Sequence, residues 1–189
     1  MTTALIVLAI LAVAVIGILV YASMQPDTFR IERSAVINAP KEKIASIVTD
    51  LHRGVEWSPL EKGLTMKKTF SGPASGVGSA MEWDGDKQSG AGKFTITDVT
   101  PSKITSNLDM TKPMKASNIV EYTLEPQGDA TKMTWSIHGP MTLISKIMSL
   151  FMNIDRMCGN QFEKGFRDLK TVAERDTPAV SDGSRTAAA

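Results

Sequence analysis

The chain has 189 residues, enough for one domain of ordinary size with appendages. Its 21 Lys and Arg residues nearly balance its 20 Asp and Glu residues, and they are scattered among the acids, so no basic surface for nucleic acid is expected. The single cysteine, Cys158, excludes an intrachain disulfide. Because His52 and His138 are also far apart in sequence, we expect neither a metal site nor a bound cofactor.

Residues 1–26 contain no charged side chain, and residues 4–22 are almost entirely Ala, Ile, Leu and Val. At about 1.5 Å of rise per residue, such a run is nearly as long as the ~30 Å hydrocarbon core of a bilayer is thick. The segment therefore predicts a transmembrane helix across residues 4–22, within an anchor formed by residues 1–26. A cleaved signal peptide is the alternative, but the run is longer than a usual signal core and no Lys or Arg precedes it.

Lys and Arg flank this segment only on its downstream side, at Arg30, Arg33, Lys41 and Lys43. Because positive charge favours the cytoplasmic side of a membrane helix, the remaining chain is expected in the cytoplasm. The protein is thus predicted to cross the cell membrane once.

The segment 28–37 alternates polar and apolar residues and predicts a strand. A short helix is expected next, because Pro40 suits a first helical turn and Ile44, Ile47 and Val48 form an apolar face. Residues 53–63 contain glycine and proline and predict a loop or a second short helix.

From Leu64 to Pro140 the sequence becomes a series of period-2 segments separated by turn-forming residues. Short turns between successive strands predict an antiparallel meander. The six strands are expected near residues 65–71, 77–85, 91–99, 103–111, 116–125 and 130–139.

Alternation along these strands assigns one apolar face and one polar face. The polar face carries residues such as Lys67, Glu82 and Glu121 and should meet water. The apolar face is predicted to hold Met66, Phe70, Met81, Trp83, Phe94, Ile96, Leu108, Met110, Val120, Tyr122, Met133, Trp135 and Ile137.

A helical apolar stripe follows Pro140 and runs from Ile144 to Leu169, which predicts one long helix or two collinear ones ending near Arg175. This stripe is the only long apolar surface available to cover the sheet. Residues 27–176 should form one α+β domain, an antiparallel seven-stranded sheet curled around the C-terminal helix. The small and polar residues 177–189 predict a disordered tail.

The interior of this domain is either hollow or filled. Methionines on the inner faces are flexible and suit a surface that accepts varied apolar shapes, but apolar residues at these spacings also pack ordinary cores. Cys158 lies on the helical stripe and is interpreted as a small buried hydrophobe rather than a nucleophile.

The order of strand, helix, meander and long helix resembles the helix-grip fold of the SRPBCC superfamily, which includes START and Bet v 1-like proteins. More narrowly, the chain looks like the bacterial polyketide cyclase/dehydrase-like proteins, some of which carry an N-terminal membrane helix. The likeness covers about residues 29–174 and is carried by INAPKEKIASIVTDL, WSPLEK, SGPASGVGSAMEWDG, GAGKFTITDVTP, TKMTWSIHGP and GNQFEKGFRDLK.

The resemblance implies a deep apolar cavity between the sheet and the long helix, used for lipids, sterols, polyketides or quinones. No motif here matches an established catalytic centre of the superfamily, so no catalytic residue is assigned. The residues expected to contact a ligand are Trp57, Phe70, Met81, Trp83, Phe94, Met110, Tyr122, Trp135, Met148, Phe151, Met152, Phe162 and Phe166.

The leading hypothesis is a membrane-anchored binding protein for a lipid, isoprenoid or polyketide-like molecule. A cyclase or hydrolase is a second hypothesis, in which His138 would act with Glu82 or Tyr122 as acid and base. The third is an interaction or assembly module with a filled core, which would show a large exposed apolar patch and no pocket.

Overall fold

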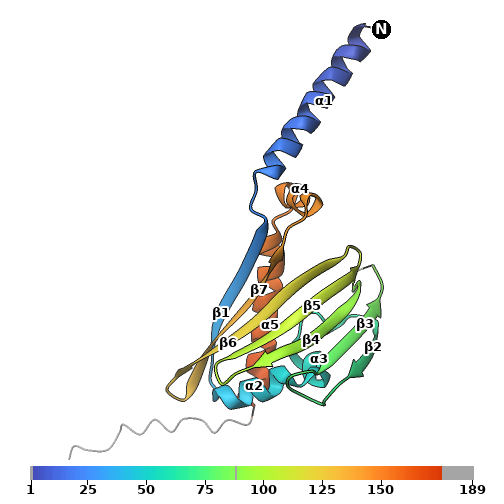
Figure 1. The fold of residues 1–189 in the computed structure, drawn as a ribbon. Coiled ribbons are helices and arrows are strands. Elements are labelled where there is room, and N and C mark those ends of the chain that lie inside the picture. Colours follow the sequence, from blue (N-terminus) through green and yellow to red (C-terminus); the bar gives the residue numbers. More distant parts are fainter. Residues whose placement is uncertain (1, 88, 176–189) are drawn as a thin grey trace, which may run out of the picture.

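The computed structural model describes residues 2–87 and 89–175. The predicted tail at 177–189 lies outside the described residues. Within them, the chain forms an N-terminal helix that projects from an α+β body (Figure 1).

The body is built on a seven-stranded antiparallel sheet with the order β1-β7-β6-β5-β4-β3-β2. The meander and its apolar and polar faces are as the alternation predicts, because each turn reverses the chain beside its predecessor. The strands are β1 Thr28–Ile37, β2 Met66–Ser71, β3 Ala80–Gly85, β4 Ala91–Val99, β5 Lys103–Lys112, β6 Ala116–Gln127 and β7 Ala130–Pro140.

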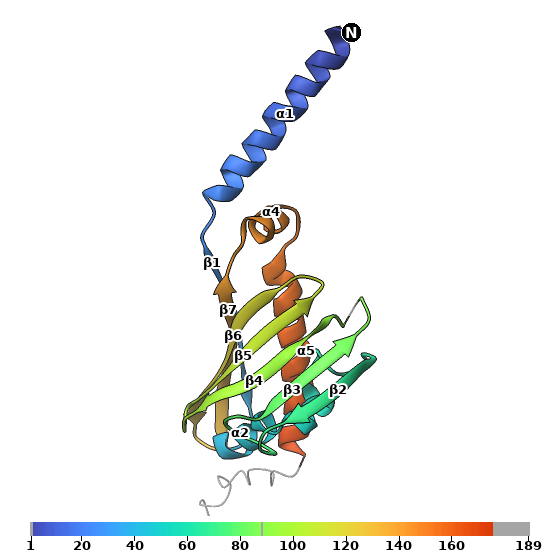
Figure 2. The ribbon, with the colours of Figure 1, turned by 45° about the vertical axis from the view of Figure 1, so that its right-hand side comes forward.

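Helix α5, Ile154–Glu174, lies across the inner face of the sheet, which curls around it (Figures 1 and 2). Its buried side includes Phe162, Phe166 and Leu169. The helix begins at Asn153, whose side chain accepts a hydrogen bond from the backbone N–H of Arg156. This arrangement is the helix-grip fold expected from the sequence.

Three short helices follow β1 and cover the end of the sheet at which β1 stops (Figure 1). They are α2 Lys41–Thr49, the 3-10 helix η1 Leu51–Arg53 and α3 Gly54–Trp57. Pro40 occupies the N-cap of α2 with an extended backbone, one position earlier than expected. Ile44 and Ile47 of α2 pack into the core, as their spacing predicts.

The prediction of one long helix, or two collinear ones, after Pro140 was wrong. Residues Leu143–Phe151 form a separate helix, α4, that lies across the end of α5 instead of continuing it (Figures 1 and 2). The Thr142 hydroxyl caps α4 by accepting a hydrogen bond from the N–H of Ser145, and the helical backbone is interrupted at Met152, which is extended, and at Asn153. Each helix has its own N-cap. The apolar residues of the predicted stripe therefore lie on two helices that run in different directions.

The N-terminal apolar helix α1, Thr2–Ser23, leaves the body at the end of the sheet where β1 begins and β7 ends (Figures 1 and 2). It is long and apolar enough to cross a bilayer, although a signal sequence has the same length and composition. From Thr3 to Ser23 its side chains are exposed except for Ala22, which is buried, and α1 is in contact with α4.

Candidate functional site

A cavity of about 240 Å³ lies between the inner face of the sheet, α5 and the segment from α2 to the start of β2. Its walls are mainly apolar. The sheet contributes Met66, Met81, Trp83, Phe94, Leu108, Met110, Val120, Tyr122, Trp135 and Ile137, whereas Val48, Leu51, Trp57, Leu60, Leu64 and Phe162 close it from the helical side. The inner-face strand residues meet here because alternate side chains of curled strands point toward one centre.

Most of the side chains expected to contact a ligand line this cavity. They are Trp57, Met81, Trp83, Phe94, Met110, Tyr122, Trp135 and Phe162. Their contact with a ligand stays a prediction, but the fold does bring them together around one space.

The other expected contacts lie elsewhere. Phe70 stacks on the ring of His52 with centroids 4.0 Å apart, and Phe166 is buried behind Trp135. Met148, Phe151 and Met152 belong to α4 or its C-cap and are exposed, because the stripe breaks before α5. Phe151 and Met152 line a separate open groove under α4.

Sequence reasoning missed part of the wall contributed by Asp50, Ser58, Leu60, Glu61 and Leu64. These residues lie between or beside short helices where no periodicity marks an inner face. The Trp57-Ser58-Pro59 turn was the one available signal, since a large aromatic residue before a turn commonly anchors a loop on a core.

An aromatic cluster forms the deep wall of the cavity. The Trp135 ring stacks on Phe162 at 4.4 Å with an interplanar angle of 12°, and Trp57 meets it edge-on at 5.5 Å. Tyr122 lies 5.3 Å from Trp135. Such contacts fix the rings relative to one another, so this wall is stiffer than the methionine-lined part.

Polar groups interrupt the apolar wall, among them the Tyr122 hydroxyl and the Glu61 carboxylate. Burial raises the pKa of the Tyr122 phenol, and the nearby Glu61 carboxylate raises it further. Glu61 itself accepts a hydrogen bond from Lys68 Nζ at 2.5 Å, and both side chains are largely buried. The Tyr122 hydroxyl therefore stays protonated at neutral pH, which makes it a donor and not a base.

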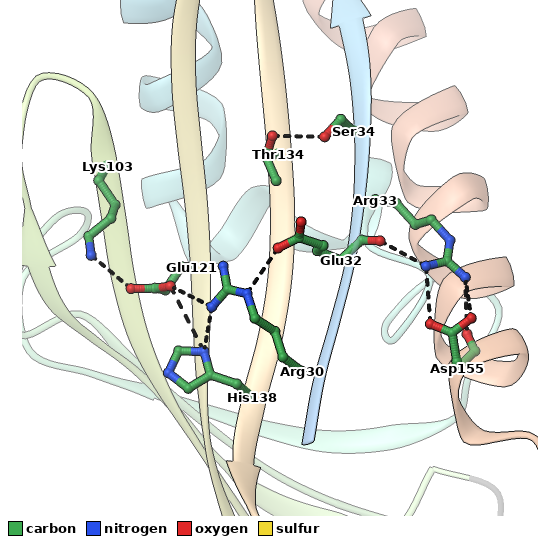
Figure 3. A network of polar contacts seen from close by, with 9 residues as sticks. All are labelled: Arg30, Glu32, Arg33, Ser34, Lys103, Glu121, Thr134, His138 and Asp155. Carbon is green, nitrogen blue, oxygen red and sulfur yellow. Dashed lines mark hydrogen bonds and ion pairs between the residues drawn. The ribbon is translucent and has the colours of Figure 1, made fainter. Parts of the chain in front are cut away.

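The acid and base residues of the enzyme hypothesis are not brought together. His138 lies on the outer face of the sheet, where its Nδ1 is 3.3 Å from Arg30 Nη1 and 3.9 Å from Glu121 Oε2 (Figure 3). Glu82 also faces outward and pairs with Lys93. Tyr122 points to the opposite side of the sheet, so the proposed pairing of His138 with Glu82 or Tyr122 inside the cavity was wrong.

Cys158 is half-buried against the core. Burial raises the pKa of its thiol, and the neighbouring Asp155 carboxylate acts in the same direction. A thiol with a raised pKa is a poor nucleophile at neutral pH, as expected for a residue that packs. Across residues 2–87 and 89–175, His, Cys, Asp and Glu side chains form no group of three or more able to hold a metal ion.

Residues 28–174 match the family model described as "Polyketide cyclase / dehydrase and lipid transport". The chain belongs to this family. The matched range is the body alone, from the first residue of β1 to the last residue of α5, and it excludes α1. No curated protein sequence is significantly similar to the chain.

Solved structures share the fold of this polyketide cyclase/dehydrase and lipid transport family member at low sequence identity. A protein from Chromobacterium violaceum is 18% identical, with a TM-score of 0.57 over 80% of this chain and 100% of that one. Ginseng major latex-like protein 151 from Panax ginseng is 13% identical, with a TM-score of 0.54 over 78% and 99%. The Aha1 dimer from Colwellia psychrerythraea is 19% identical, with a TM-score of 0.53 over 78% and 97%.

Proposed function

We propose that this protein is a membrane-anchored binding protein for a hydrophobic small molecule, such as a lipid, an isoprenoid or a polyketide-like compound. The observation that carries the proposal is the apolar cavity of about 240 Å³ between the sheet and α5. Ligand pockets usually measure about 300–1,000 Å³, so the cavity suits a small or slender ligand. The flexible Met66, Met81 and Met110 give the wall room to adjust.

The polar features of the wall favour a ligand with one polar end. Trp57 and Trp135 line the cavity, and the described residues give their buried indole N–H groups no hydrogen-bond partner. A buried polar group without a partner costs about 1–3 kcal/mol. A carbonyl or ether oxygen on the ligand would accept a hydrogen bond from such a donor. The best-fitting class is thus an apolar molecule bearing an oxygen acceptor.

Binding without a chemical step is favoured over catalysis. The ionisable side chains that line the cavity are Asp50, Glu61 and Tyr122. Tyr122 is protonated, Glu61 is paired with Lys68, and Asp50 accepts a hydrogen bond from the backbone N–H of His52, so none is arranged as a free general base. A filled-core interaction module is disfavoured because the space between sheet and helix is not filled.

The apolar helix α1 supports membrane anchoring. Its described side chains between Ala4 and Tyr21 are exposed, which in water would leave a large unpaired apolar surface. Insertion in the bilayer removes that cost and keeps the cavity near the phase in which hydrophobic ligands dissolve. The downstream cations, including Arg30 and Arg33, favour a cytoplasmic body.

The test is native mass spectrometry of residues 27–176 followed by extraction and identification of bound molecules. This segment suffices as a folded unit because similar solved proteins, covered over 97–100% of their own length, consist of the body alone. Recovery of a stoichiometric apolar ligand supports the proposal. Empty protein, together with no thermal shift on adding lipids or aromatic ketones, contradicts it.

A matched pair of variants on β5 ties binding to the cavity. Leu108→Trp adds an indole inside the cavity, whereas Asn107→Trp adds the same group on the exposed outer face. The first is expected to abolish ligand retention and the second to leave it unchanged. Equal retention by both variants would place the ligand outside this cavity.

A further inference from the structure

Helix α4 has its polar and apolar sides reversed relative to an ordinary surface helix. Its side chains Leu143, Ile144, Met148 and Phe151, together with Met152 at its C-cap, are exposed, with Phe151 at 73% and Ile144 at 61%. We call these five residues the α4 apolar face. Its one charged residue, Lys146, is instead 5% exposed. In water this arrangement would leave the apolar side uncovered, so α4 is shaped for a less polar medium.

The chain holds α4 close to the end of α1. The backbone N–H of Met141 donates to the Asp27 carbonyl at 2.7 Å, and Lys146 Nζ donates to the Asp27 carboxylate at 2.6 Å. Hydrogen bonding to Lys146 lowers the pKa of that carboxyl group. Asp27, which directly precedes β1, thus contacts the segment that leads into α4 and Lys146 within α4.

The distance from α4 to the end of α1 is limited by covalent geometry. The segment Met24–Asp27 has four residues, which can span at most about 14 Å when extended. In the folded chain α1 and α4 are in contact. The interfacial layer on each side of a bilayer is about 5–8 Å thick, and a helix in contact with the end of a membrane span lies at its level.

The β5–β6 turn, at the same end of the sheet as α4, also carries an exposed apolar side chain. Residues 113–115 connect β5 to β6, and Met114 there is 43% exposed between Lys112 and Lys115. An exposed apolar side chain flanked by lysines suits the boundary between acyl chains and anionic headgroups. The β5–β6 turn and α4 both lie on the side of the body from which α1 leaves (Figure 2), and each exposes apolar side chains there.

We propose that α4 lies in the interface of the bilayer that α1 crosses, with the α4 apolar face among the lipid acyl chains. This inference rests on the proposed membrane anchor. The occupant is a bilayer because α4 is in contact with α1 and because the exposed, lysine-flanked Met114 lies at the same end of the sheet. Docking holds the body against the membrane instead of leaving it on a loose tether.

The experiment uses the full chain reconstituted in vesicles of phosphatidylcholine and phosphatidylglycerol. The only native cysteine is removed by Cys158→Ala, and Phe151→Cys is then labelled with an environment-sensitive fluorophore. The matched control is Asp129→Cys, labelled in the same way, in the β6–β7 turn at the opposite end of the sheet. Phe151 is exposed, so its replacement leaves the core intact. Alkaline carbonate extraction of the same vesicles reports separately whether the chain is integrated in the membrane.

The expected result is blue-shifted emission from position 151 that is quenched by lipids brominated near the headgroup, with water-like emission from position 129. If the protein resists carbonate extraction but position 151 gives water-like emission, the docking of α4 is overturned and the membrane anchor is retained. A blue shift that brominated lipid does not quench and that grows with the protein-to-lipid ratio identifies a second copy of the chain, which also overturns it. Extraction of the whole chain by carbonate rejects the anchor and the docking together.

Discussion

At the scale of single residues, the Tyr122 hydroxyl is a donor in the cavity wall that can recognise the polar end of a ligand. Removing it by Tyr122→Phe keeps the ring that packs 5.3 Å from Trp135. A neutral hydrogen bond contributes about 0.5–1.5 kcal/mol, so affinity for an acceptor-bearing probe such as 1,4-naphthoquinone should fall roughly two- to tenfold. Affinity for naphthalene, which has the same ring system without oxygen, should not fall.

Isothermal titration of both probes into the wild-type body and the variant checks this prediction. An equal loss for the two probes would show that the phenylalanine ring altered the packing of the wall, and would argue against recognition through the hydroxyl.

Glu121 makes the stability of the body depend on pH. A hydrogen bond from Lys103 at 2.8 Å lowers the pKa of Glu121, Arg30 acts in the same direction, and burial opposes both (Figure 3). Because the folded pKa lies below the unfolded value of about 4.3, this contribution is complete above pH ~5 and is lost as the pH falls through the folded pKa. Glu121→Gln should lower the unfolding free energy at pH 7 by about 1 kcal/mol, and this difference should shrink in acid.

Urea unfolding of residues 27–176 between neutral and acidic pH measures that difference. Glu125→Gln is the control, since Glu125 forms an exposed ion pair with Lys132 on the neighbouring strand β7 and should contribute little. A Glu121 difference that stays constant down to pH ~3 would exclude the ion-pair explanation.

At the scale of elements, the strands could be predicted closely and the C-terminal helices could not. Each strand of the meander repeats with period 2 and ends in a glycine, proline or aspartate turn, so its limits and inner face follow from local chemistry. The helical period of the apolar stripe, however, continues through Met152 and Asn153 although the direction of the chain changes there. Asn153 was the signal available, because asparagine is a preferred N-cap.

The same contrast holds for the cavity. Wall residues on strands, such as Met81 and Met110, follow from alternation, whereas Glu61 and Leu64 depend on how an aperiodic loop closes over the sheet. Whether the interior is filled depends on how far α5 stands from the sheet. That separation is set by side-chain contacts in three dimensions, which no periodicity records.

Gly165 sets the approach of α5 to the sheet. A Cβ added there would lie 2.6 Å from Trp135 Cζ3 and 3.0 Å from Pro59 Cδ. Alanine favours a helix by about 1 kcal/mol over glycine, but overpacking a core costs about 1–3 kcal/mol, so Gly165→Ala should destabilise the body by about 1 kcal/mol. It should also change ligand affinity, because Trp135 is part of the cavity wall.

Urea midpoints compare this variant with Gly159→Ala, the other buried glycine of α5. The Cβ at position 159 would meet only the guanidinium end of Arg33, which can move away at the cost of its contact with Asp155 (Figure 3). Gly165→Ala should be the less stable of the two variants. If it is more stable than the wild type, the contact between α5 and Trp135 does not limit their separation.

At the scale of the whole molecule, the proposed function requires α1 to remain attached as a membrane span. A retained helix leaves an intact mass of 20.4 kDa in the membrane fraction, whereas cleavage after Ala22 would release a shorter body. Introducing Ile10→Arg and Val13→Arg places two charges at the centre of the span, each costing about 2.5–3.5 kcal/mol on insertion scales. The doubly substituted chain should shift to the soluble or carbonate-extractable fraction with its body still folded.

Intact mass spectrometry and carbonate extraction after expression in a bacterial host check both statements. Thr3→Ser within α1 serves as the control that changes the helix without adding charge. A mature chain that begins after Ala22 would show that α1 is a cleaved signal sequence and not an anchor. The body would then bind its ligand without being held at the bilayer. A retained α1 instead places β1, α4 and the adjoining edge of the sheet beside the lipid, because only four residues separate the end of α1 from the start of β1.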